Sequence, residues 1–329
     1  MNCVILDGFA ATGNDLDFQP IRDLCQRVTV YQRTPPEEII RRIGNAQAVL
    51  TNKCVIDREV MESCPQLEYI GVTATGCNVV DLQAAQERGI TVTNVPGYST
   101  QAVAQQVFAY LLDYTNRVAD LNRQVQQGGW SRCQDFCFYP DGLRLLSGMK
   151  LGIFGFGAIG QQVASIALGF GMKVLVCTRT VTKKMEKKFP AVKFVSWGKL
   201  LAKSDVITIH TPLTPQTKHL FDQTAFAQMK PKSVLINTAR GDIVNDLHLA
   251  QAVNSGHLAG AYLDVTPQEP LPQASPLLGV PGIVITPHCA WAARECRKKL
   301  IQVCAQNLKA YQKGKPIHVV KPQGGTIKP

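Results

Sequence analysis

Three ionisable residues each follow a short apolar run in the C-terminal half of the chain: Arg240 in NTARGDIVN, Glu269 in LDVTPQEPLP and His288 in ITPHCAW. Taken singly, they are compatible with a surface ion pair, a solvated loop acid and a core histidine. Together they supply what the reduction of a keto acid needs. A guanidinium binds a carboxylate through two hydrogen bonds, an imidazolium protonates the developing alkoxide, and a nearby carboxylate keeps that imidazolium charged.

The surrounding pattern predicts how these residues are positioned. From residue 148 onward, apolar runs such as DVITIHTP, SVLINTA, AGAYLDV and GIVITPH alternate with helix-compatible segments. Unbroken Val/Ile runs of this kind are typical of a parallel sheet covered on both faces. Ligands bind beyond the carboxyl ends of such strands, so we expect the three residues at one edge of the sheet.

The first hundred residues show the same alternation of apolar runs and helix-compatible segments, which predicts a second, smaller α/β unit. Its apolar runs are CVIL, VTVY, AVLT, LEYIGV and ITVTNV, and PPEEIIRRIG and DLQAAQERG between them are helix-compatible. After the last apolar run, apolar residues at helical spacing over 293–314 predict a helix of about five turns.

A glycine motif, GFGAIG, follows the run KLGIF and opens a predicted helix. Gly155 permits a tight turn, Gly157 allows the backbone to approach a pyrophosphate, and Gly160 allows the helix to pack closely on the strand. The free N–H groups of the helix would then face phosphate. This context favours dinucleotide binding over a purely structural turn.

The stretch VLVCTRT carries Thr178 where a dinucleotide-binding protein often has an acid that binds the ribose hydroxyls. Arg179 and Thr180 are instead suited to a 2′-phosphate, so we predict NADP rather than NAD. If Arg179 stacks on adenine or points to solvent, NAD serves equally.

Composition indicates a soluble globular protein of two domains, with 329 residues, 45% hydrophobic and 18% charged. The net charge of +11 is compatible with nucleic-acid binding, but the lysines of TKKMEKKF (182–189) have no interleaved aromatic residues. We therefore expect a solvated helix at this segment and do not expect a nucleic-acid partner. No signal peptide or membrane span is expected. The eleven scattered cysteines, without a CxxC pair, favour neither disulfides nor zinc and suggest a cytoplasmic location.

The motifs GFGAIG, NTARGDIVN, LDVTPQEPLP and TPHCAWAARECR resemble, in order and spacing, the D-isomer-specific 2-hydroxyacid dehydrogenase family over nearly the whole chain. NVPGYSTQAVAQQVFAYLL and WSRCQDFCFY are most similar to glycerate dehydrogenases, also called hydroxypyruvate reductases. The resemblance implies two doubly wound parallel-sheet domains, Rossmann-like and flavodoxin-like, with a cleft between them. A discontinuous substrate domain (1–101 and 294–329) and a dinucleotide-binding domain (102–293) are expected, with a long helix over 101–127 and homodimers formed through the dinucleotide-binding domains.

The resemblance also assigns roles to residues of this chain. Arg240 would bind the substrate carboxylate, His288 would act as acid/base, Glu269 would support His288, and the amides of Thr75 and Gly76 would contact the carboxylate. Asp264 would bind the nicotinamide amide. The remaining cofactor-binding residues would be Gly155, Gly157, Ala158, Ile159, Gly160, Thr178, Arg179, Thr180, His210, Thr211, Pro212, Thr217, Thr238, Ala239, His288 and Ala290.

The expected reaction is reduction of a small 2-keto acid to the D-2-hydroxy acid, with the choice among hydroxypyruvate, glyoxylate and larger acids left open. Two alternatives share the fold: a dinucleotide-sensing binding protein of the corepressor type, and a dehydrogenase of a simple anion such as formate or phosphite. Gln105 departs from the family pattern, in which many members have an acid.

Overall fold

The computed structural model describes residues 1–322, so the end of the KPQGGTIKP tail lies outside the described residues. The chain divides into two compact units, one comprising Met1–Ser99 and the residues from Ala292 onward, the other Thr100–Trp291. The boundaries expected from the sequence lie close to these. The roles of the two units as substrate and dinucleotide-binding domains remain predictions. Within residues 1–322, no helix is long and apolar enough to cross a membrane.

The first unit is built on a five-stranded parallel sheet with the strand order β2-β1-β3-β4-β5, which is the flavodoxin-like order. Its last helix, α13, contacts α1, α2 and β4 of the same unit. The elements are β1 (Asn2–Ile5), α1 (Gly8–Thr12), α2 (Gln19–Arg22), β2 (Arg27–Val30), η1 (Pro36–Glu38), α3 (Ile39–Ile43), β3 (Ala48–Thr51), α4 (Arg58–Ser63), β4 (Tyr69–Val72), α5 (Leu82–Glu87), β5 (Thr91–Thr93) and α13 (Arg294–Gln312).

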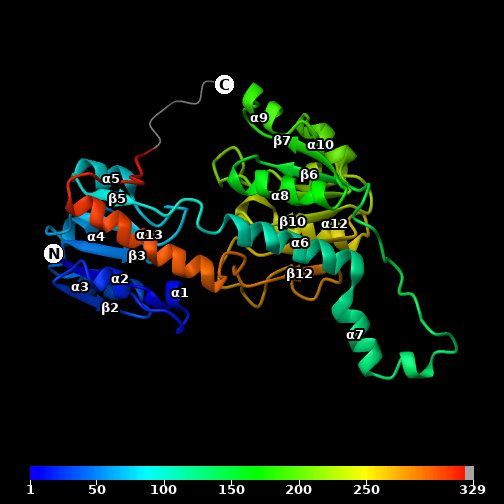
Figure 1. Cartoon of the computed structure of the whole chain (residues 1–329), viewed down its shortest axis with the longest axis horizontal. Coiled ribbons are helices and arrows are strands. Elements are labelled where there is room, and N and C mark those ends of the chain that lie inside the picture. The colour runs from blue at the N-terminus through cyan, green and yellow to red at the C-terminus, as the bar shows by residue number, and fades with distance from the viewer. Residues whose placement is uncertain (323–329) are drawn as a thin grey trace. The chain divides into compact units, whose positions relative to one another are not determined.

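The second unit holds a seven-stranded parallel sheet ordered β12-β11-β10-β9-β6-β7-β8, a Rossmann arrangement (Figure 1). The predicted doubly wound α/β fold is therefore confirmed. The elements are α6 (Thr100–Asn116), α7 (Val118–Gln126), η2 (Trp130–Arg132), β6 (Lys150–Phe154), α8 (Ala158–Gly169), β7 (Lys173–Cys177), α9 (Lys183–Lys188), β8 (Val192–Phe194), α10 (Trp197–Lys203), β9 (Val206–Ile209), α11 (Gln223–Gln228), β10 (Val234–Asn237), η3 (Gly241–Ile243), α12 (Asp246–Asn254), β11 (Gly260–Leu263) and β12 (Ile283–Ile285).

One predicted helix is divided in two. The helix expected over 101–127 is interrupted at Arg117, whose φ of 51° places it in the left-handed region and ends the helical path. The Arg117 guanidinium donates to Asp120 Oδ2 at 2.7 Å and to the Asp141 carbonyl at 2.8 Å. These contacts stabilise the bend from which α7 starts in a new direction (Figure 1).

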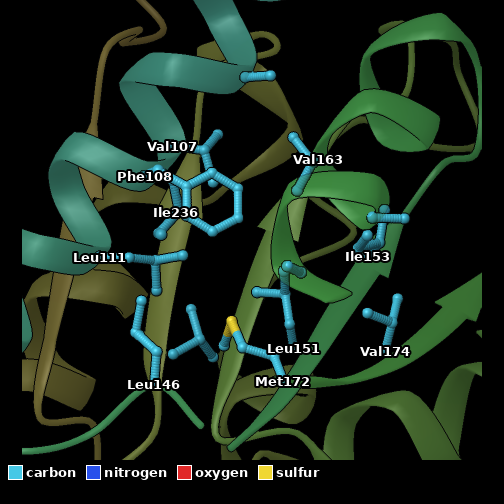
Figure 2. Packing of buried hydrophobic residues seen from close by; sticks show 14 of the residues in the cluster. Val107, Phe108, Leu111, Leu146, Leu151, Ile153, Val163, Met172, Val174 and Ile236 are labelled. Atoms are coloured by element: carbon cyan, nitrogen blue, oxygen red, sulfur yellow. The ribbon is translucent and has the colours of Figure 1, made fainter. Parts of the chain in front are cut away.

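The core of the second unit fixes the strand and the helix that flank the glycine motif. Val107, Phe108 and Leu111 of α6 pack in one cluster with Leu151 of β6 and Val163 of α8 (Figure 2). All five side chains are buried. Because this apolar packing holds β6 and α8 rigidly, the turn between them has a defined shape.

Candidate active site

His288 and Glu269 form a hydrogen-bonded pair in the loops that follow β12 and β11. His288 Nδ1 lies 2.6 Å from Glu269 Oε2, and the two side chains are 27% and 31% exposed. The adjacent parallel strands carry both residues at their carboxyl ends. Because Nδ1 is engaged by Glu269, Nε2 is the ring nitrogen that can exchange a proton with a substrate oxygen.

Backbone contacts orient both members of this pair. Thr266 N donates to Glu269 Oε1 at 3.2 Å, so each carboxylate oxygen has a defined partner. The amide of His288 donates to the Asp264 carbonyl at 2.8 Å, and Trp291 Nε1 donates to the His288 carbonyl at 3.0 Å. His288 has a φ of 51°, an uncommon left-handed conformation that these contacts maintain.

Asp264 connects the end of β11 to the His288 loop. Its Oδ1 accepts hydrogen bonds from the Thr286 hydroxyl at 2.6 Å and the Cys289 amide at 2.9 Å, and its Oδ2 accepts the Ala290 amide at 2.9 Å. The Tyr110 hydroxyl of α6 is hydrogen-bonded to Thr286. The carboxylate, which is almost fully buried, therefore fixes the loop. Whether Asp264 also binds the nicotinamide amide stays a prediction.

Arg240 follows β10, the neighbour of β11, and the side chain of Asn237 shapes its turn. Asn237 Oδ1 accepts the Ala239 amide at 3.0 Å, and Nδ2 donates to the Arg240 carbonyl at 2.9 Å. A Cβ on the next residue, Gly241, would lie 1.9 Å from the carbonyl carbon of Thr266. The Arg240 turn is thus packed against the loop that carries Glu269, and only glycine fits at that contact.

The glycine motif has the geometry of a phosphate-binding turn. Gly155 has a φ of +95°, and a Cβ there would lie 2.5 Å from the His210 carbonyl oxygen. A Cβ on Gly160 would lie 2.3 Å from the Gly155 carbonyl oxygen, whereas one on Gly157 would meet no atom within 4 Å. Gly157 precedes α8 without a side-chain cap. The free N–H groups at this helix terminus therefore face open space and fit a pyrophosphate.

Residues at neighbouring strand ends extend this site. Thr178 is half-buried just after β7, and Arg179 and Thr180 are exposed beside it. The Thr238 hydroxyl at the end of β10 is buried and has no hydrogen-bond partner among the described residues. An unpaired buried hydroxyl is costly, and a bound ligand with a polar group would satisfy it. The observed residues thus fit a nicotinamide dinucleotide.

The segment after β9 is held by local hydrogen bonds. His210 Nε2 lies 2.9 Å from the Thr208 hydroxyl, and desolvation lowers the pKa of His210 to about 3, so its ring is neutral at physiological pH. The Thr217 hydroxyl donates to the Pro212 carbonyl at 2.9 Å. Thr211, Pro212 and Thr217 are at least partly accessible, as a lining of the cofactor site requires.

Thr75 and Gly76 belong to the first unit, in the loop after β4. The Thr75 hydroxyl donates to the Val95 carbonyl at 2.8 Å, and Asn94 Nδ2 donates to the Thr75 carbonyl at 2.7 Å. The loop is therefore held to the segment after β5. Their predicted contact with the substrate carboxylate stays a prediction.

Sequence reasoning missed Asn237, Thr286 and Tyr110 as supports of the site. Asn237 carries a readable signal, because it is a polar residue closing the apolar run SVLIN. Tyr110 and Thr286 are 176 positions apart and carry no local signal that would connect them.

The sequence was compared with known proteins. Residues 108–290 match the model of the D-isomer specific 2-hydroxyacid dehydrogenase NAD-binding domain. The chain is 40% identical to a hydroxypyruvate reductase of Blautia hydrogenotrophica over 97% of this chain and 99% of that protein. It is 36% identical to a glyoxylate reductase of Korarchaeum cryptofilum over 90% of this chain and 89% of that protein.

Among solved structures, an acyclic imino acid reductase in complex with NADPH and D-Arg is similar with a TM-score of 0.83, at 26% identity, over 97% of this chain and 100% of that one. The fold and the site are those of a dehydrogenase with a domain that binds a nicotinamide dinucleotide. The chain belongs to the D-isomer-specific 2-hydroxyacid dehydrogenase family. It is therefore an enzyme, an oxidoreductase.

Proposed function

We propose that this enzyme reduces a small 2-keto acid of the hydroxypyruvate or glyoxylate type to the D-2-hydroxy acid, with NADPH as the preferred cofactor. The observation that carries the proposal is the His288–Glu269 pair, 2.6 Å apart, at the ends of β12 and β11; β11 is in turn the neighbour of β10, which Arg240 follows. A formate-type oxidation has no carbonyl oxygen to protonate and would leave this pair without a role. The named substrates of the two relatives support the same substrate class.

In the proposed mechanism, a dinucleotide held at the glycine turn before α8 would supply the hydride that reduces C2 of the keto acid. Arg240 binds the substrate carboxylate through its planar fork and polarises the adjacent carbonyl. His288 Nε2 donates its proton to the oxygen on which negative charge develops. Glu269 stabilises the imidazolium before the transfer, and the amides of Thr75 and Gly76 are proposed to bind the substrate carboxylate as well.

The proposed preference for NADPH depends on the residues after β7. Thr178 provides no carboxylate to bind the ribose hydroxyls or to repel an added phosphate, and the exposed Arg179 guanidinium is available for a 2′-phosphate. The imino acid reductase of similar fold is in complex with NADPH, so a fold of this kind can hold that dinucleotide.

Steady-state kinetics with hydroxypyruvate, glyoxylate and a larger 2-keto acid, each with NADPH and with NADH, test the proposal. We expect the highest kcat/KM with NADPH and one of the two small acids, and a D-configured product. Arg179→Ala should raise KM for NADPH and leave KM for NADH nearly unchanged. Higher kcat/KM with NADH would refute the cofactor assignment, and an L product would refute the proposed geometry.

We further propose that the enzyme is cytoplasmic and forms homodimers through the second unit. Large apolar side chains are exposed on the segment between α7 and β6, with Phe136, Tyr139 and Leu145 at 86%, 79% and 81%. Such a concentration of exposed apolar surface is typical of an interface. Light scattering should give the mass of a dimer for the wild type and of a monomer for Phe136→Glu/Leu145→Glu. A monomeric wild type would contradict this assembly.

A further inference from the structure

A groove of about 520 Å³ on the second unit is lined by four lysines, Lys150, Lys193, Lys199 and Lys203. Its remaining lining residues are Leu175, Phe194 and Val195. The groove lies alongside α10, over the α10-facing side of β7 and β8. Lys150 begins β6, at the opposite end of that strand from the glycine turn, so the groove is not part of the dinucleotide site.

The groove forms where α10 packs on β6 and β7. A Cβ on Gly152 would lie 2.2 Å from Ser204 Oγ and 3.1 Å from Leu200 Cδ1, so α10 packs directly on that glycine. Strand register pairs Gly152 with Leu175 and Leu175 with Lys193, and paired residues point to the same face of a sheet. The three-residue strand β8 is at the sheet edge, so within residues 1–322 no strand lies beyond this strip.

No ion pair with a carboxylate neutralises any of the four lysines of the groove in the part of the chain that the structure describes. Burial acts to raise the pKa of the nearby Asp205 carboxyl, whereas the Lys150 amide, Lys230 and, to a smaller extent, the charge of Lys150 lower it below its ordinary value. Asp205 accepts the backbone amide of Lys150 at 2.8 Å, but its carboxylate is paired with Lys230. Lys199 and Lys203 are one helical turn apart on α10, where like charges repel. A bound anion would relieve this repulsion.

We propose that the groove binds a small molecule bearing a triphosphate group. Such a group concentrates several negative charges in a short flexible chain, which matches ammonium groups spread along a helix and a strand. The groove volume is in the range of small-molecule sites. Its apolar floor at Leu175 and Val195 is compatible with a nucleoside attached to the phosphates, so free triphosphate and a nucleoside triphosphate are two sources of one chemistry.

Calorimetric titration of the NADPH-saturated enzyme with inorganic triphosphate tests the proposal, because NADPH blocks both the phosphate site at the glycine turn and the proposed 2′-phosphate site at Arg179. We expect Lys193→Gln/Lys199→Gln to weaken binding at least about tenfold. The matched control Lys183→Gln/Lys184→Gln removes the same charge from α9, outside the groove, and should weaken binding less than about twofold.

Equal weakening by the two double variants would overturn the proposal, because binding would then reflect only the general positive field. Displacement of triphosphate by NADPH would also overturn it, as would binding only of long RNA. A parallel titration with ATP distinguishes the two sources: tighter binding than inorganic triphosphate indicates that a nucleoside contacts the apolar floor, and equal binding indicates that the phosphates alone are bound. Near-wild-type keto-acid reduction by both double variants will show that they are folded.

Discussion

Replacing Glu269 by glutamine removes the charge beside His288 and keeps the shape of the side chain. The Glu269–His288 hydrogen bond is 2.6 Å long, and both side chains are about two-thirds buried, so solvent screens the interaction only in part. A hydrogen bond to a charged group contributes about 1.5–3 kcal/mol. Glutamine retains an acceptor but not the charge, so most of this stabilisation of the imidazolium is lost. We therefore expect kcat for keto-acid reduction to fall roughly ten- to hundredfold.

The split between kcat and KM separates this role from a merely structural one. The variant lacks the negative charge that holds the proton donor in place for the transfer, so the deficit should appear in kcat. KM for the keto acid should change little. Steady-state rates at pH 7.5 measure both parameters, and Glu186→Gln, an exposed acid of the same unit, is the matched control. A kcat for Glu269→Gln within about twofold of wild type at pH 7.5 would refute the reasoning.

Three further predictions concern binding and stability. Arg240→Lys should lower kcat/KM for the keto acid about ten- to hundredfold, because one ammonium cannot reproduce a bidentate fork, while the Kd for NADPH measured by fluorescence stays near wild type; an unchanged kcat/KM would argue against the assignment. Gly241→Ala should lower the free energy of unfolding measured in urea by about 1–3 kcal/mol, because its Cβ would meet the Thr266 backbone; an equally stable variant would contradict this packing. Burial, and secondarily the charge of Asp242, raise the pKa of Asp246 to about 6. As pH rises, the Asp246 carboxyl therefore ionises at a lower pH in the unfolded state than in the folded state, which destabilises the folded state. Asp246→Asn should raise the free energy of unfolding by about 1 kcal/mol above pH 7, and this gain should vanish near pH 3.5. A difference between variant and wild type that does not change with pH would contradict this linkage.

Much of the strand framework could be predicted from the sequence because buried parallel strands leave unbroken apolar runs. AVLT coincides with β3, and KLGIF with β6. The short edge strand β8 was missed, because three residues with an exposed lysine between partly buried neighbours carry little pattern. The break at Arg117 was also missed, since it depends on a left-handed residue held by a carbonyl 24 positions away.

The same difference between local patterns and long-range contacts applies to the candidate site. Arg240, Glu269 and His288 could be proposed because each is a reactive side chain placed just after an apolar run. The network from Tyr110 through Thr286 to Asp264 could not, because it joins residues that are brought together only by the sheet and α6. The lysines of the groove are also dispersed. The register of β6, β7 and β8 places Lys150 and Lys193 on one face, and α10, which carries Lys199 and Lys203, packs on that face.

The turnover rate of His288→Ala tests most directly the claim that His288 is the acid/base, because no other residue in the proposed mechanism supplies the proton. Hydroxypyruvate reduction with NADPH should fall by at least about a thousandfold, while the Kd for NADPH stays within about twofold of wild type. A variant that binds NADPH normally and still reduces hydroxypyruvate at a near-normal rate would contradict the assignment of His288 as the acid/base.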